Sequence, residues 1–287
     1  QVLRHQVGPA TLTSLVGSPS HLVVLQHGLS GTASDLKCLA DELAAGGATV
    51  HLAASSEGQT TDGIAAGGRR LAEEIRGLVA SSPGLTDLSL VGNSLGGLYV
   101  RYAATELLSE DGLSVAGLRP ATFATIGCPH LGVRKFTFVP VPDWLQPAAS
   151  VLVGRTGEEL MLQDKGQLLL EMTRQDSRYM RALMAFQSRI LFANLWGDFM
   201  VPLGTAAIEP EFGAGMGDEA SAIALAKRPE MEILDRDVLN RRRDGIAMRL
   251  VVNCREAVPA IGAEAAMASG LHSCSWTKHF IGFHATG

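Results

Sequence analysis

The segment Gly92-Asn93-Ser94-Leu95-Gly96 contains the group in this chain that is best placed for covalent chemistry, the hydroxyl of Ser94. The apolar residues before it predict the end of a buried strand, and the apolar segment after it predicts a helix. A serine between two glycines at such a strand-to-helix turn is typical of a nucleophile elbow, which lifts the hydroxyl out of the sheet. The alternative is a glycine-rich turn whose serine only caps the helix.

A nucleophilic serine needs backbone donors for the negative charge that develops on the substrate oxygen. We predict that the N–H of Leu95, at the start of the helix, is one of them. The second donor in enzymes with this turn comes from the loop after an earlier strand. Here the strand His21–Gln26 leads into His27-Gly28-Leu29, so we assign the second donor to Leu29.

The serine also needs a histidine base and a carboxylate that orients the histidine. In α/β-hydrolases these residues follow in the order serine, acid, histidine, and the acid lies after a later strand. Asp198, just after the predicted strand Arg189–Leu195, fits this position, although a turn aspartate is the alternative. Asp164 and Asp176 are rivals that fall in a predicted cap.

Three histidines follow Asp198 in the sequence, namely His272, His279 and His284. We predict His284 as the base because it ends the last strand-like segment, Phe280–Phe283. The alternative for His284 is an ordinary surface histidine, and His279 could be a strand side chain.

Two further histidines follow predicted strands on the side of the sheet where Ser94 is expected. His27 precedes the serine in the sequence, so we expect it to shape the oxyanion loop rather than to act as the base. His130 follows Pro129 and is a candidate for the wall of an acyl pocket. A structural role is the alternative for both.

Strand and helix patterns alternate from His21 onward, which predicts an α/β fold with a mostly parallel central sheet and helices on both faces. Residues 133–187 lack a clear strand and predict an inserted, mainly helical cap on a single domain that covers residues 1–287. Residues 209–245 are expected to be a polar, partly helical excursion. The remaining expected strands are Thr49–Ala53, Leu85–Val91, Ala121–Ile126 and Met248–Asn253, and the expected helices are Asp35–Ala45, Ile64–Val79 and Leu95–Leu108.

Composition excludes several classes of function. The net charge of −5 offers no electrostatic basis for nucleic-acid binding. No apolar run reaches bilayer-spanning length and no signal-peptide pattern occurs, so we expect no transmembrane segment. The four cysteines lack metal-type spacing, and reduced thiols would favour an intracellular compartment. The glycine-rich stretch Gly63 to Gly68 has neither dinucleotide-binding nor phosphate-loop spacing, so we expect no cofactor and no metal.

Several blocks together resemble one family, the DUF676 group of serine esterases and lipase-like proteins. They are His27-Gly28-Leu29, Gly92 to Leu98, Pro129 to Gly132, Gly197-Asp198 with Val201, Arg155-Thr156-Gly157, Tyr179–Phe186 and Thr205-Ala206. The resemblance implies an α/β-hydrolase that acts on lipid esters, with Ser94 as nucleophile and Asp198 as acid. Asn93 stands where the family usually has histidine. The family's base follows a segment that resembles Trp276 to His284, so either His284 serves or the base lies beyond Gly287.

The predicted cap is rich in apolar residues, from Phe136 to Val153, which suits acyl-chain substrates. The alternative is that these residues form only the cap's own core. We therefore predict a serine esterase or lipase that acts on lipid or small esters, with possible peripheral membrane contact through the cap. Two alternatives stay open: a hydrolase-fold scaffold without a working base, and an acyltransferase that uses the same serine. The oligomeric state is not predicted.

Overall fold

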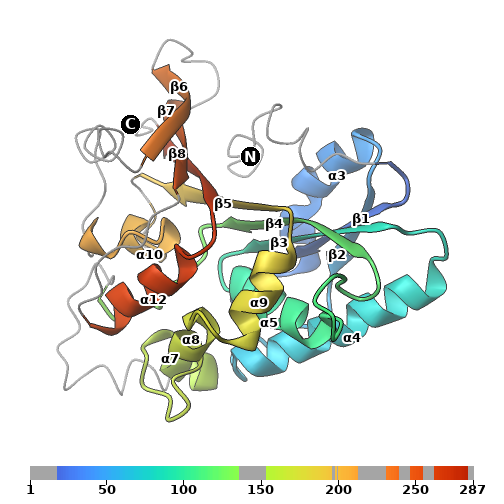
Figure 1. Cartoon of the computed structure of the whole chain (residues 1–287), viewed down its shortest axis with the longest axis horizontal. Coiled ribbons are helices and arrows are strands. Elements are labelled where there is room, and N and C mark those ends of the chain that lie inside the picture. The colour runs from blue at the N-terminus through green and yellow to red at the C-terminus, as the bar shows by residue number, and fades with distance from the viewer. Residues whose placement is uncertain are drawn as a thin grey trace.

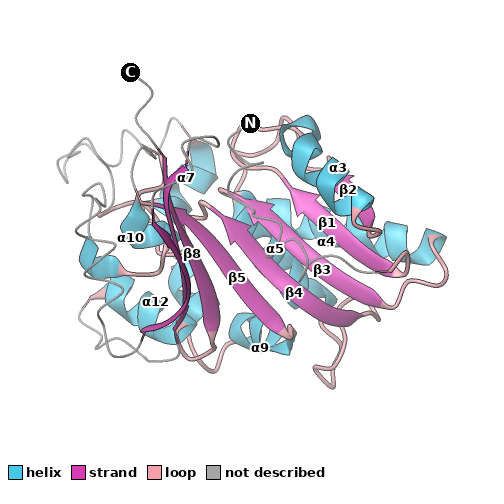
Figure 2. Ribbon diagram, turned by 90° about the horizontal axis from the view of Figure 1, so that it is seen from above, coloured by secondary structure: helices cyan, strands magenta, loops and turns pink. Residues whose placement is uncertain are grey.

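The structure is a computed structural model that describes residues 18–135, 153–195, 198, 200–212, 231–238, 246–254 and 262–283. Its central feature is one eight-stranded sheet with the order β2-β1-β3-β4-β5-β8-β7-β6 (Figure 2). The strands are β1 (His21–Gln26), β2 (Thr49–Ala53), β3 (Asp87–Asn93), β4 (Arg119–Ile126), β5 (Ser188–Asn194), β6 (Met231–Val238), β7 (Ile246–Cys254) and β8 (Trp276–Phe283). The first five and β8 run parallel, whereas β7 and β6 pair antiparallel at one end.

Helices cover both faces of this sheet. Figure 1 shows α3 on one side and α4, α5 and α9 on the other. The helices are α3 (Lys37–Ala45), α4 (Ile64–Ser81), α5 (Gly96–Leu107), α7 (Gly154–Leu160), α8 (Leu168–Thr173), α9 (Arg178–Ala185), α10 (Leu203–Ala206) and α12 (Ala263–Leu271), with 3-10 turns η1 (Ala33–Leu36) and η2 (Pro210–Phe212). The predicted α/β fold, with a mostly parallel sheet and helices on both faces, is confirmed.

The central strands are apolar throughout because both of their faces are covered, as in other parallel sheets. Along β1, Val23 and Leu25 pack toward α3, whereas Leu22 and Val24 join the larger core beneath α4 and α5. Every residue of β1 is buried. The period-two alternation of the two cores fixes the register of the strands, since a shift by one residue would exchange the two faces.

Most predicted elements agree with the structure to within three residues, but one prediction is wrong. Residues 209–245 were expected to be a partly helical excursion, and the structure places strand β6 at residues 231–238. The strand has the charged sequence Asp-Arg-Asp near its end. Because β6 is the edge strand of the sheet, it tolerates charges that a central strand would not.

The segment between β4 and β5 contains three described helices, α7, α8 and α9. Helix α9 packs on α5, and α8 packs on α12 near the C-terminus. The apolar stretch of the predicted cap, Phe136 to Val153, lies outside the described residues except for Val153. The interpretation of residues 133–187 as a cap on a single domain stays a prediction. Among the described helices, none combines the length and the apolar character needed to cross a membrane.

The loop after β2 is held by one carboxylate of α4. Glu74 accepts hydrogen bonds from the His51 ring at 2.8 Å and from the backbone N–H groups of Ala54 and Ser55 at 3.1 Å each. Burial alone would raise the pKa of Glu74, but these hydrogen bonds lower it to about 2. The charged form of Glu74 therefore stabilises the start of this loop.

We predict that Glu74→Gln lowers the free energy of unfolding at pH 7 by about 2 kcal/mol, because hydrogen bonds to a charged acceptor are lost. The folded-state pKa lies below the unfolded value, so the contribution is fully present above about pH 4.5 and is lost as the pH falls toward 2. Urea denaturation at several pH values measures both effects. The exposed neighbour Glu73→Gln is the control. A difference between E74Q and the parent that stays constant from pH 6 to pH 2.5 would contradict the assignment.

Candidate active site

Ser94 lies at the turn between β3 and α5, with its backbone in the left-handed region at φ +53°. This region is costly for a residue with a side chain, so the surrounding structure must hold it. The Ser94 N–H donates to the Ile126 carbonyl at the end of β4, with an N···O distance of 2.8 Å. Ser94 is only partly buried, and its hydroxyl makes no hydrogen bond to any described residue. The turn thus presents, at the carboxyl edge of the sheet, a hydroxyl that no described residue binds.

Three glycines allow the chain to close around this turn. A Cβ atom on Gly92 would overlap the backbone of Gly96 and Gly97. A Cβ atom on Gly96 would lie 2.5 Å from the His27 carbonyl oxygen, and one on Gly28 would lie 2.8 Å from the Ser94 Cβ. The loop after β1 therefore lies directly against the turn that bears Ser94.

The two predicted oxyanion donors lie on segments next to Ser94: Leu95 follows it in the sequence, and Leu29 follows Gly28, which packs against it. Within the described part of the chain, no hydrogen bond occupies the N–H of Leu95 or the N–H of Leu29. Leu95 precedes helix α5, whose N-terminal end favours negative charge. Gly28 is in contact distance of Ser94, and this brings the peptide that follows it to the same side. Both amides are thus available for an anionic oxygen.

Asp198 lies at the same edge of the sheet, beyond the end of β5. Its Oδ2 accepts from the Asn194 side chain at 3.1 Å, and its Oδ1 accepts from the N–H groups of Met200 and Val201 at 3.1 and 2.9 Å. A Cβ atom on Gly127, the residue after β4, would lie 3.5 Å from Asp198 Oδ2. The end of β4 therefore separates Asp198 from Ser94, and three hydrogen bonds orient the carboxylate.

The predicted base, His284, lies outside the described residues, but the strand that leads to it is described. Strand β8 pairs in parallel with β5, with Ile281 opposite Asn194, so the chain after β8 starts next to the Asp198 segment. The other two candidates are buried in packed positions. His272 hydrogen-bonds to the buried Lys278 at 2.9 Å, and the His279 ring stacks on Phe192 with centroids 4.6 Å apart.

His27 and His130 are both fully buried. His27 Nδ1 bonds to the Gly28 carbonyl at 3.0 Å, inside the loop it was predicted to shape. His130 Nε2 bonds to the Thr125 hydroxyl at 2.9 Å, and its ring packs edge-on against Trp276. Burial, together with the nearby charges of Arg101 and Lys278, lowers the pKa of His130 well below its usual value. This placement favours the structural alternative, and a pocket role for either residue stays a prediction.

Two polar contacts of the described residues escaped the sequence analysis. Asn194, the last residue of β5, orients Asp198, and its position four residues before the acid was the only signal. The buried ammonium of Lys278 in β8 pairs with Glu209, after α10, at 2.5 Å. Nothing in the spacing of these two residues indicates a pair, because 69 residues separate them.

Comparison with protein families finds one match, to the family described as "Putative serine esterase (DUF676)", over residues 17–209. That range contains the Ser94 turn, the loop after β1 and Asp198.

Named relatives are lipases by description. A "Putative lipase" of Schizosaccharomyces pombe is 29% identical over 265 residues, which cover 86% of this chain and 32% of the relative. A "Putative lipase" of Saccharomyces cerevisiae is 28% identical over 207 residues, 66% of this chain and 30% of its own length. A "Triacylglycerol lipase" of Pseudarthrobacter phenanthrenivorans is 33% identical over 123 residues, 41% of this chain and 35% of its own. The chain thus spans about a third of the length of these relatives.

Solved structures with a similar chain path include the mature form of the Bacillus licheniformis lipase BlEst2. It is 17% identical, has a TM-score of 0.40, and the match covers 66% of this chain and 71% of that one. A monoacylglycerol lipase of Paleococcus ferrophilus matches with a TM-score of 0.38 and 16% identity, over 68% of this chain and 79% of that one.

We predict that Gly96→Ala destabilises the protein by about 3 kcal/mol, because the new methyl group meets backbone atoms of β1 that cannot move aside. Gly77→Ala in helix α4 is the control: a Cβ atom there meets nothing within 4 Å, and alanine should stabilise the helix by about 0.5 kcal/mol. Chemical denaturation measures both. Equal stabilities of G96A and G77A would show that the turn is not closely packed.

Proposed function

Because the chain belongs to the family described as "Putative serine esterase (DUF676)", we propose that it hydrolyses carboxylic esters through an acyl-enzyme on Ser94. One observation carries this proposal: Ser94 stands at a left-handed turn that packs against Gly28, and no described group occupies the N–H of Leu95 or of Leu29. A serine that served only as a helix cap would accept a hydrogen bond from the helix, and no such bond is made at α5.

In the proposed acylation step, Ser94 Oγ forms a bond to the ester carbonyl carbon while His284 takes the hydroxyl proton. The carbonyl oxygen becomes an oxyanion, and the Leu95 and Leu29 N–H groups donate to it. When the tetrahedral intermediate collapses, the bond to the alcohol breaks and the histidine returns the proton to the leaving oxygen. Asp198 stabilises the charged imidazolium in between.

Water then attacks the acyl carbonyl carbon while His284 takes a proton from it. The bond from the acyl carbon to Ser94 Oγ breaks, the histidine returns the proton to Oγ, and the carboxylic acid is released. Hydrolysis and acyl transfer differ only at this step, where an alcohol can replace water. Product analysis therefore tests the acyltransferase alternative: hydrolysis releases the acid, whereas transfer to an alcohol yields a new ester. The scaffold alternative predicts no chemistry at Ser94.

We propose lipid or acylglycerol esters as the substrate class. The relatives named as lipases support this class, although the chain spans only about a third of their length. The apolar segment predicted to contact acyl chains and membrane surfaces lies largely in residues 136–152, outside the described residues. The substrate class therefore rests on the relatives and on the sequence of this segment.

We predict that Ser94→Ala abolishes turnover of p-nitrophenyl butyrate and p-nitrophenyl decanoate, with kcat at least about 10³-fold below the parent, because no acyl-enzyme forms. Ser81→Ala, at the exposed end of α4, is the control and should retain full activity. Turnover by S94A at the parent rate would refute the proposal.

We predict that Asp198→Asn lowers kcat by about 10³- to 10⁴-fold with little change in KM, since the histidine loses the charge that orients it. Asp176→Asn is the matched control, because Asp176 is an exposed rival that pairs with Arg174. Steady-state kinetics of the two variants shows whether Asp198 or Asp176 is the acid. Full activity in D198N with lost activity in D176N would move the acid to the other position.

A further inference from the structure

The loop after β1, which bears the proposed donor Leu29, is held in an unfavourable conformation. Ser30 has φ +52°, in the left-handed region that a serine seldom adopts. The loop therefore needs contacts that fix it, and the bond between the Gly31 N–H and the Gly28 carbonyl is internal to it. The contacts that matter are those from other parts of the chain.

Two hydrogen bonds tie this loop to the loop after β2. The Ser30 N–H donates to the Thr60 hydroxyl oxygen at 2.9 Å, and the Ala33 N–H donates to Glu57 Oε1 at 2.7 Å. Thr60 is buried, whereas Ala33 is partly buried and Glu57 is exposed. The bond to Thr60 is partly buried and the bond to Glu57 is exposed. Shielding from water strengthens a hydrogen bond, so Thr60 is the stronger anchor.

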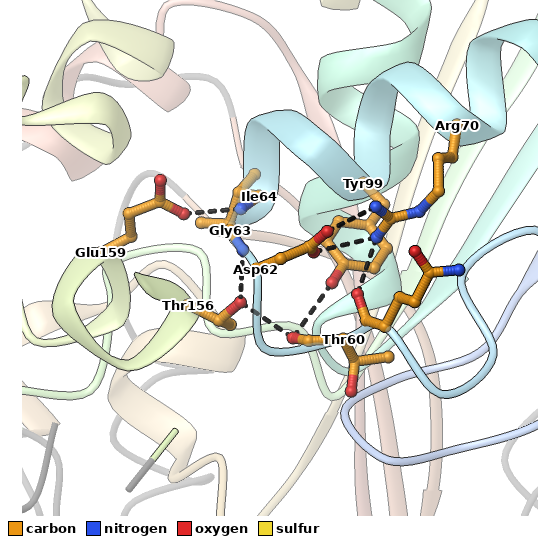
Figure 3. A network of polar contacts seen from close by, with 9 residues as sticks. Thr60, Asp62, Gly63, Ile64, Arg70, Tyr99, Thr156 and Glu159 are labelled. Carbon is orange, nitrogen blue, oxygen red and sulfur yellow. Dashed lines mark hydrogen bonds and ion pairs between the residues drawn. The ribbon is translucent and has the colours of Figure 1, made fainter. Parts of the chain in front are cut away.

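Thr60 is in turn fixed by its own carbonyl oxygen, as Figure 3 shows. That oxygen accepts from the Thr156 hydroxyl at 2.8 Å and from the Tyr99 hydroxyl at 3.3 Å. Thr156 belongs to α7, in the segment predicted as the cap, and Tyr99 belongs to α5, which follows Ser94. Thr60 thus joins the loop after β1, helix α5 and helix α7.

Helix α7 is fastened to the same place by a second set of contacts. The Thr156 hydroxyl oxygen accepts from the Gly63 N–H at 3.0 Å, and Glu159 accepts from the Ile64 N–H at 2.6 Å. The Glu159 carboxylate is buried at the N-terminal end of α4, where the helix dipole favours negative charge. Thr156 and Glu159 therefore lock α7 to the segment that contains Thr60.

We propose that Thr60 is a positioning residue, which sets the orientation of the oxyanion loop and links it through Thr156 to helix α7. The catalytic part of this inference rests on the proposed function, because it takes the Leu29 N–H as an oxyanion donor. The Thr60 hydroxyl holds the Ser30 peptide, and the next N–H along the chain toward β1 is that of Leu29. Loss of the hydroxyl frees the loop to leave the left-handed conformation at Ser30.

The first test uses hydrogen–deuterium exchange of the amides in residues 28–31 and does not depend on activity. Thr60→Val removes the hydroxyl and keeps the shape, so exchange at these amides should quicken about 10-fold or more. Thr60→Ser keeps the hydroxyl and should restore the parent rate. Thr105→Val is the matched control: Thr105 is also buried, and its hydroxyl donates to the Arg101 carbonyl within α5. Unchanged exchange at residues 28–31 in T60V overturns the proposal.

The second test measures the oxyanion contact itself. A thionoester carries sulfur in place of the carbonyl oxygen, and sulfur is a weak hydrogen-bond acceptor, so its turnover depends less on the donors. T60V should lower kcat for the p-nitrophenyl ester about 10-fold with KM within about twofold, and should lower the ester-to-thionoester rate ratio. General destabilisation of the protein would lower the turnover of the ester and of the thionoester by the same factor. An unchanged ratio in T60V contradicts the positioning role.

Thr156 supplies the test of the link to α7. Thr156→Val should lower the ester-to-thionoester rate ratio, and Thr156→Ser should restore it. Because both residues act on one loop, the fold decrease of this ratio in T60V/T156V should be smaller than the product of the fold decreases in T60V and T156V. Effects that multiply fully would show that α7 and Thr60 act independently. If the parent and S94A are equally inactive, the proposed function fails, and the exchange measurement alone still decides whether Thr60 holds the loop.

Discussion

The backbone of Ser94 is held in a left-handed conformation, and the arrangement of the proposed site depends on it. This conformation costs about 1–3 kcal/mol and persists only where the neighbouring structure fixes it. The hydrogen bond from the Ser94 N–H to the end of β4 and the close approach of Gly92 and Gly96 to neighbouring backbone supply that constraint. If the turn relaxed, the hydroxyl and the Leu95 N–H would no longer face the same volume.

Parallel pairing explains how distant residues arrive beside this turn. Strands β1, β3, β4, β5 and β8 run in one direction, so the segments that follow them gather at one edge of the sheet. Ser94 follows β3, and Asp198 follows β5 after a short connection. The end of β8, which precedes His284 in the sequence, lies beside the end of β5. The fold thus supplies the order and spacing on which the proposed triad relies.

Much of the fold could be predicted from the sequence because the central strands carry strong local signals. Strands β1 and β2 match their predicted ranges. Each is a short run of apolar or β-branched residues that ends at polar residues or glycine. The turn at Ser94 was predictable because two glycines are required close to it. Strand β6 was not predictable, because an edge strand needs no apolar pattern. It forms by pairing with β7, and the local sequence of residues 231–238 does not indicate that pairing.

The supporting polar contacts were beyond prediction for a different reason. Thr60 and Thr156 lie 96 residues apart, and their bond depends on how the loop after β2 packs against helix α7. The Lys278–Glu209 pair likewise joins β8 to the segment after α10. Ordinary threonines and charged residues carry no local sign of such roles. Local patterns therefore predicted the turn and the strands, and tertiary packing determined what holds them in place.

The central claim is that Ser94 is a nucleophile, and covalent labelling tests it most directly. The full-length protein is incubated with a fluorophosphonate, digested, and mapped by mass spectrometry. The account predicts one phosphonyl group on Ser94, with no label in the folded S94A variant. A folded parent protein whose Ser94 stays unmodified at concentrations that fully label a known serine esterase would contradict it.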